Sequence, residues 1–246
     1  MRWLLSAVLL VLSPAAGAAP AFDHEHTLWT TVLKSSVNEG NVAYMDLAGD
    51  DKKLSRYLDT LKAVTPAQYN AWTDKQKMAF WINAHNAFAV RFILDRHPLE
   101  SIRADAVKKP FIPIRALGPD DLSLTDIQNI LGTRFTDVRV HFALTAPARS
   151  APALRPSAYR ADALDSQLED AAYAFINDPD RNSVDVDRGV ARLNPLFRDH
   201  RKEFDSVPRG LPGFLALYVS AENADRMRTT RMKIEYSEMD WALNGR

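Results

Sequence analysis

The sequence predicts an α+β protein, a single compact domain with several helices packed with a small, mostly antiparallel sheet. Apolar residues recur at helical spacing along most of the chain, whereas the strand-like stretches are few and short. The stretches lack the regular strand–helix alternation that indicates a doubly wound sheet. We find no internal repeat and no Gly/Ser linker, so residues 22–246 are expected to form one globular domain.

A central buried helix is expected over about residues 75–97. Thr73 and Gln76 form a capping box before it, Pro98 ends it, and apolar residues between them leave no polar face. A second capping box, Ser123 with Asp126, predicts another helix start. Shorter helices are expected over residues 27–34, 54–61, 163–177, 196–204 and 215–221, and after Pro66.

Strands are predicted where apolar and polar residues alternate. Residues 138–145 place Val138 and Val140 on one face and Arg139 and His141 on the other. A turn followed by a short extended piece is expected within 38–47. Residues 183–187 and 190–193 are expected to form a hairpin, and residues 231–236 a last strand.

The first 21 residues have the pattern of a secretory signal peptide. Arg2 precedes an apolar run that ends in small residues, and cleavage fits after Ala18 or Ala21. The protein is therefore expected in the periplasm or outside the cell. No later stretch approaches the roughly 20 apolar residues of a membrane span.

Composition excludes several kinds of chemistry. The 31 Lys and Arg balance the 31 Asp and Glu, which argues against nucleic acid as a partner. The absence of cysteine removes disulfides, thiolate nucleophiles and thiolate metal sites. Without a phosphate-binding glycine loop or a helical histidine pair at zinc spacing, no cofactor is expected. A small molecule or a protein remains as the partner.

Four strings taken in order resemble one known family: FWINAHNAF (80–88), VHFAL (140–144), LDSQLEDAAYAFINDP (164–179) and EMDWALN (238–244). They resemble the proteins grouped as domain of unknown function 547, over roughly residues 38–246. Tyr44, Trp81, Asn83, Asn86 and His141 match motif positions of that family. The family usually has two cysteines after the histidine segment, and this chain has Ala146 and Ala151 there.

The resemblance implies a degenerate site. A cysteine beside a histidine is the minimum for a thiolate nucleophile, so the family site resembles that of a cysteine hydrolase, although two close cysteines also suit a disulfide or redox pair. With Ala146 and Ala151 neither chemistry survives. His141 is then either a buried structural residue or part of a remaining pocket, and Ser150 is the nearby hydroxyl that it could activate.

Other candidates for a binding site are weighed against structural roles. Trp81, Asn83 and Asn86 either line a ligand pocket or, as buried amides and aromatic core, bond within the fold. Arg149 and Arg155 either lie on the solvated surface or flank His141 and bind an anionic group. His24 and His26 follow the signal, and a mature start at Phe22 would place His24 third, which suits Cu(II) or Ni(II).

Two main functions follow from these residues, and metal handling through the N-terminus is a third possibility. The first is a non-catalytic ligand-binding or accessory protein on a degenerate scaffold. The alternative is a hydrolase or transferase that acts through His141 with Ser150 or a bound water. A cleft holding His141 and Ser150 within hydrogen-bond reach favours the enzyme, and a loop closed over His141 favours the accessory protein.

Overall fold

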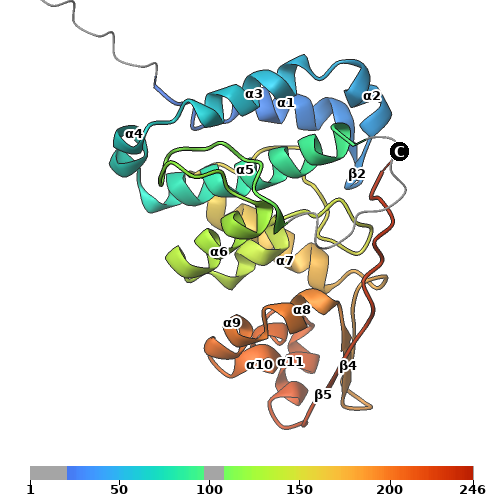
Figure 1. Ribbon diagram of the computed structural model, residues 1–246. Coiled ribbons are helices and arrows are strands. Elements are labelled where there is room, and N and C mark those ends of the chain that lie inside the picture. Colours follow the sequence, from blue (N-terminus) through green and yellow to red (C-terminus); the bar gives the residue numbers. More distant parts are fainter. Residues whose placement is uncertain (1–20, 97–107, 246) are drawn as a thin grey trace, which may run out of the picture.

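Helix α5, Asp74–Leu94, is the buried helix that the sequence predicts. The computed structural model describes residues 21–96 and 108–245, and in it α5 crosses the helical half of the molecule (Figure 1). The hydroxyl of Thr73 accepts from the Gln76 amide, and the Gln76 side chain accepts from the Thr73 amide, so the expected capping box is present. Pro98, the expected stop, lies outside the described residues.

Helices surround α5 and form a first hydrophobic cluster with it. They are α1 (Thr27–Ser36), α2 (Tyr44–Gly49), α3 (Lys52–Lys62), α4 (Pro66–Ala71), α6 (Leu124–Arg134) and α7 (Leu164–Ile176). The extended piece expected within 38–47 is shorter than predicted. Strands β1 (Val37–Asn38) and β2 (Asn41–Val42) form a small antiparallel hairpin, and α2 follows directly.

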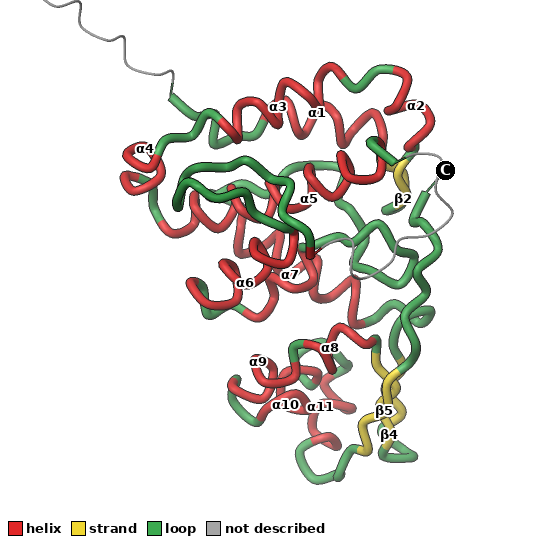
Figure 2. The backbone as a smooth tube through the Cα atoms, in the orientation of Figure 1, coloured by secondary structure: helices red, strands yellow, loops and turns green. Residues whose placement is uncertain are grey.

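A second hydrophobic cluster lies in the C-terminal part of the chain. It contains α8 (Pro195–Asp199), α9 (Arg201–Ser206), α10 (Gly210–Leu215), α11 (Ala221–Met227) and a sheet of β3 (Ser183–Asp185), β4 (Val190–Leu193) and β5 (Lys233–Tyr236). Strands β3 and β4 form the expected antiparallel hairpin, and β5 pairs with β4 in parallel. Figure 2 shows β4 and β5 side by side in yellow. The α+β class is thus confirmed, with the sheet beside the later helices while α5 packs mainly on other helices.

Two helix predictions in this part need correction. The helix expected over 196–204 is interrupted at His200 and forms α8 and α9. The helix expected over 215–221 is absent, because α10 ends at Leu215 and Ser220 starts α11 by accepting from the Asn223 amide. Leu217, inside the expected helix, is 72% exposed.

The strand predicted over 138–145 is wrong. Residues Val138–Ala143 form a 3₁₀ helix, η2, whose start is capped by the Asp137 carboxylate accepting from the Arg139 amide at 3.0 Å. Val138 packs in the second hydrophobic cluster and Val140 in the first. The alternation that resembled a half-buried strand therefore reflects a short helix whose residues enter both clusters.

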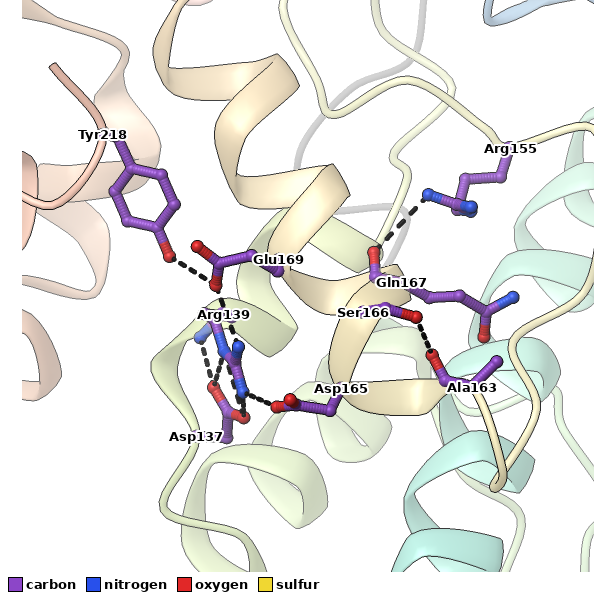
Figure 3. A network of polar contacts seen from close by, with 9 residues as sticks. All are labelled: Asp137, Arg139, Arg155, Ala163, Asp165, Ser166, Gln167, Glu169 and Tyr218. Carbon is purple, nitrogen blue, oxygen red and sulfur yellow. Dashed lines mark hydrogen bonds and ion pairs between the residues drawn. The ribbon is translucent and has the colours of Figure 1, made fainter. Parts of the chain in front are cut away.

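Arg139 fixes η2 against α7 (Figure 3). Its guanidinium donates to Asp137 at 2.7 Å, to Asp165 at 2.6 Å and to Glu169 at 2.9 Å, and the Tyr218 hydroxyl also donates to Glu169. These hydrogen bonds, Asp137 first, hold the pKa of Arg139 above its usual value. The network ties the segment that carries His141 to both hydrophobic clusters.

The chain after β5 returns to the helical half as an extended tail, drawn in red in Figure 1. The Val42 amide donates to the carbonyl of Asn244, whose side chain accepts from the Tyr44 hydroxyl. A Cβ on Gly245 would lie 2.0 Å from the Val42 carbonyl, so this close approach requires glycine. Across residues 21–96 and 108–245, no helix combines the length and apolar character needed to cross a bilayer.

Candidate functional site

A cavity of about 670 Å³ opens where α6, η2 and α8 meet. The loop that follows η2 forms one wall, and the returning tail around Ser237–Trp241 forms another. The volume lies within the roughly 300–1,000 Å³ of small-molecule sites. It is larger than two further pockets among the described residues, of about 380 and 250 Å³.

His141 lines this cavity and is paired with a carboxylate. Its Nε2 atom lies 2.7 Å from Oε2 of Glu203, and its ring is stacked on that of His200 with the centroids 3.7 Å apart. Nδ1 of His200 lies 3.2 Å from Oε1 of the same glutamate. One carboxylate therefore accepts from two imidazoles at the edge of the cavity.

The pKa values of Glu203 and His200 are both lowered. The hydrogen bond from His141, assisted by His200 and opposed by partial burial, lowers the pKa of Glu203 to about 2. Burial, and then the neighbouring His141, lowers the pKa of His200. At neutral pH Glu203 is charged and His200 is a neutral imidazole that retains a lone pair.

The start of α9 positions both His200 and Glu203. His200 lies at the joint between α8 and α9, and Glu203 follows in the first turn of α9. Opposite the carboxylate, α6 carries Gly132, where a Cβ would lie 3.0 Å from Oε2 of Glu203. A glycine on α6 thus leaves the space that the carboxylate occupies.

Ala146 and Ala151 both line the cavity together with His141. The loop that carries them is held at several points. Asn86 donates to the carbonyl of Ala143 at 2.8 Å and accepts from the amide of Thr145 at 3.0 Å. The sequence resemblance places cysteines at these two alanines, so the missing thiols would face the same space as the imidazole.

Ser150 does not join the site. Its hydroxyl accepts from the amide of Asp240 at 2.8 Å, and its carbonyl accepts from Asn194. Among the described residues Ser150 neither bonds to His141 nor lines the cavity. The arrangement that would favour a serine nucleophile is therefore not formed, although the loop also leaves His141 open to the cavity.

Trp81, Asn83 and Asn86 are placed in the core beside the site. Trp81 donates to the Tyr69 hydroxyl at 2.9 Å. Asn83 donates to the carbonyl of Tyr159 and accepts from its amide. Neither these residues nor Asn86 lines the cavity within the described part of the chain, and the bonds support the structural alternative for both amides.

The arginines that were expected beside His141 lie elsewhere. Arg149 is exposed and pairs with Asp240 at 3.4 Å. Arg155 pairs with Asp170 at 3.7 Å and lies over the Tyr159 ring. The basic side chains that do line the cavity are Lys108 and Arg198, which the sequence did not single out.

His24 and His26 lie in an aromatic cluster before α1. Nδ1 of His26 lies 2.7 Å from the Tyr57 hydroxyl, and the His24 ring packs edge-on against Trp72 at 4.7 Å. Copper or nickel binding there depends on a chain start at Phe22, and it stays a prediction.

Three residues of the site were not predicted from the sequence. His200 and Glu203 are separated by three positions and share one side of a helical turn, which was the available signal. His85 lies within a matched family string, and it is buried against Asn86 with Nε2 3.3 Å from Nε2 of Gln128. Burial lowers the pKa of His85 to about 4, so it lines the cavity as a neutral ring.

The fold and the cavity together define an α+β protein with a carboxylate-bound histidine pair beside two alanines. Residues 69–176 match the family model described as Protein of unknown function, DUF547. The resemblance seen in the sequence is thereby confirmed over that region, which contains His141, Ala146 and Ala151 but neither His200 nor Glu203. No curated protein and no solved structure matches the chain.

Proposed function

We propose that the protein is an exported, non-catalytic ligand-binding or accessory protein on a degenerate cysteine-hydrolase-like scaffold. One observation carries this proposal: His141, Ala146 and Ala151 line one cavity. By the sequence resemblance, both alanines replace cysteines. A site of this kind keeps a space and an oriented imidazole and lacks the thiolate that would attack a bound molecule.

The lining suggests the chemistry of the ligand. Leu144, Pro152 and Trp241 offer apolar contact, while His141 and His200 offer nitrogen atoms. Lys108 and Arg198 add positive charge to the same lining. A small molecule with an apolar body and an anionic end would suit these groups.

Binding can be tested without a known ligand. Native mass spectrometry of the gently purified full chain would detect a bound molecule, and a thermal-shift screen of carboxylates and phosphate esters would find others. Ala146→Trp places a large side chain in the cavity and should abolish the mass increase or the shift. Ala71→Trp, at an exposed position of α4, is the matched control and should leave both unchanged.

The competing function is a hydrolase or transferase that uses His141 and a bound water. The pairing of His141 with Glu203 favours it, because a carboxylate that orients an imidazole is a common feature of general-base catalysis. Ser150 contributes less to this alternative, since its hydroxyl is bonded to the tail. Turnover of an ester, amide or thioester that disappears in His141→Ala and persists in Ser150→Ala would replace the binding proposal with this one.

Export to the periplasm or the medium is part of the same proposal. Support comes from the signal-like composition of residues 1–21, of which residues 1–20 lie outside the described structure. Cell fractionation followed by N-terminal sequencing tests it. A start at Ala19 or Phe22 supports export, and a retained Met1 in cytosolic protein contradicts it. A start at Ala19 also removes the proposed copper or nickel site at His24.

A further inference from the structure

We propose that His141, His200 and Glu203 bind one divalent transition metal ion, with Zn²⁺ as the first candidate. Each residue offers one ligand atom, and these atoms lie within 4.8 Å of one another. Two imidazole nitrogens and one carboxylate oxygen form a donor set that suits zinc and its neighbours in the first transition row.

The donors converge from two separate parts of the fold. His141 comes from η2, and His200 with Glu203 comes from the start of α9. The carboxylate of Glu203 holds both rings by hydrogen bonds of 2.7 and 3.2 Å. A cation between the three donors would replace these two bonds by coordination through the same atoms.

One ring has to adjust for coordination. The two imidazoles are stacked with an angle of 24° between their planes, and a metal ion binds in the plane of each ring. His141 is 2% exposed at its side chain and fixed in the core, whereas the side chain of His200 is 27% exposed. We therefore expect a rotation of His200 to bring its nitrogen toward the ion.

The site would remain open on one side. His141 and His200 both line the cavity of about 670 Å³, so positions that the protein leaves vacant on the ion would face that space. Three protein donors with an open position are typical of metal sites that bind a water or a ligand, in contrast to closed four-donor structural sites. The ion would then anchor the anionic end of a cavity ligand.

The negative charge at the three donors comes from Glu203. Asp199, directly before His200, lines the cavity but pairs with Arg198 at 3.0 Å, so its charge is balanced within the lining. Gly132 leaves room for the carboxylate from the side of α6. The metal proposal does not require an organic ligand, so its outcome is separate from that of the ligand-binding proposal.

The test is a zinc titration of the full chain after treatment with a chelator and its removal. Calorimetry should show one ion per chain with a dissociation constant of about 10 μM or tighter. His200→Ala and Glu203→Gln should each weaken binding at least about tenfold, because loss of even an outer-shell partner of a ligand costs about 10- to 100-fold in metal affinity. Circular dichroism of both variants checks that they fold, and Glu203→Gln keeps the shape of the side chain if the alanine variant does not.

Two controls separate this site from other metal-binding groups. Asp199→Asn removes a neighbouring charge that is outside the three donors, and His24→Ala removes the histidine of the aromatic cluster. Both should leave one tight ion per chain. Added Co²⁺ should give visible absorption bands that are lost in Glu203→Gln. Absence of stoichiometric binding, or binding that survives in His200→Ala and is lost in His24→Ala, would overturn the proposal.

Discussion

The imidazole of His141 and the carboxylate of Glu203 are joined at 2.7 Å although 62 positions separate them in the chain. The contact connects η2, which lies between the two hydrophobic clusters, with α9 in the second cluster. It also places an oriented imidazole on the cavity that Ala146 and Ala151 line. The pair thus lies beside the two alanines that, in the proposed function, replace cysteines.

The proposed function predicts that a cysteine at either alanine position has a lowered thiol pKa. In Ala146→Cys or Ala151→Cys the new thiol would face the cavity of His141, and a nearby imidazole lowers the pKa of a thiol. We expect the pKa of at least one of them to fall about one unit or more below the usual 8.5. The pH dependence of the iodoacetamide reaction measures it.

The control for the thiol experiment is Arg56→Cys, at an exposed position in the middle of α3. Its reaction should follow an ordinary thiol pKa. If all three cysteines titrate alike, the alanine positions are not coupled to His141 and the degenerate-site proposal loses its main support.

Gly132→Ala tests the space reserved for Glu203. The new Cβ would lie 3.0 Å from Oε2 of the glutamate, so the carboxylate that bonds to His141 must shift by a few tenths of an ångström. Alanine gains about 1 kcal/mol of helix propensity over glycine, so the free energy of unfolding should change by no more than about 1 kcal/mol. The Glu203 pKa should rise from about 2, as carbon-detected NMR of the carboxyl group would show.

Gly49→Ala provides the comparison, since a Cβ at Gly49 meets no atom within 4 Å. This variant should leave the Glu203 pKa unchanged. An unchanged Glu203 pKa in Gly132→Ala as well would mean that the carboxylate has another position from which it still binds His141.

The fold was predictable where its signals are local. Thr73 and Ser123 mark helix starts because a capping box needs residues only three positions apart. The segment around His141 was misread for the opposite reason. Its alternation of apolar and polar residues matches a strand, but Val138 and Val140 pack in different hydrophobic clusters. Which cluster buries each side chain depends on distant parts of the chain and cannot be read from the local pattern.

The site was predictable only in part, for the same physical reason. His141 was found through the strings that resemble a family, and its loop could be followed from there. The pairing of Glu203 with His141 could not be predicted from the sequence, because the contact forms only when α9 packs against η2. Arg149 and Arg155 are near His141 in sequence, but Arg149 forms an ion pair with Asp240 and Arg155 with Asp170.

Asn86 should be important for stability through the loop that it holds. Asn86→Ala removes a donor to the Ala143 carbonyl and an acceptor for the Thr145 amide, both buried. Leaving these backbone groups without partners should cost about 2–4 kcal/mol of unfolding free energy. Urea denaturation measures the loss.

Two variants calibrate that result. Asn86→Asp keeps the oxygen that accepts from Thr145 and should fall between wild type and Asn86→Ala at neutral pH. Asn70→Ala changes an exposed asparagine of α4 and should stay within about 0.5 kcal/mol of wild type. A loss in Asn86→Ala no greater than in Asn70→Ala would refute the structural role.

The buried His26 predicts a loss of stability in acid. Burial, and to a smaller extent His24, lowers the pKa of His26 to about 3, although Asp23 opposes the shift. Between pH 6.5 and 3 the unfolded chain therefore binds a proton that the folded protein excludes. The unfolding free energy is thus fully retained above pH 6.5 and falls as the pH decreases, by at most about 1.4 kcal/mol per pH unit for this group.

His85, whose pKa is about 4, acts in the same direction, so His26→Gln should reduce the acid dependence without abolishing it. Tyr57→Phe removes the hydroxyl beside Nδ1 of His26 but leaves the ring buried. Because burial is the main cause of the pKa shift, this control should keep the wild-type slope between pH 6.5 and 4. Denaturation by urea at several pH values gives the slopes, and equal slopes in wild type and His26→Gln would show that His26 takes up its proton without unfolding the protein.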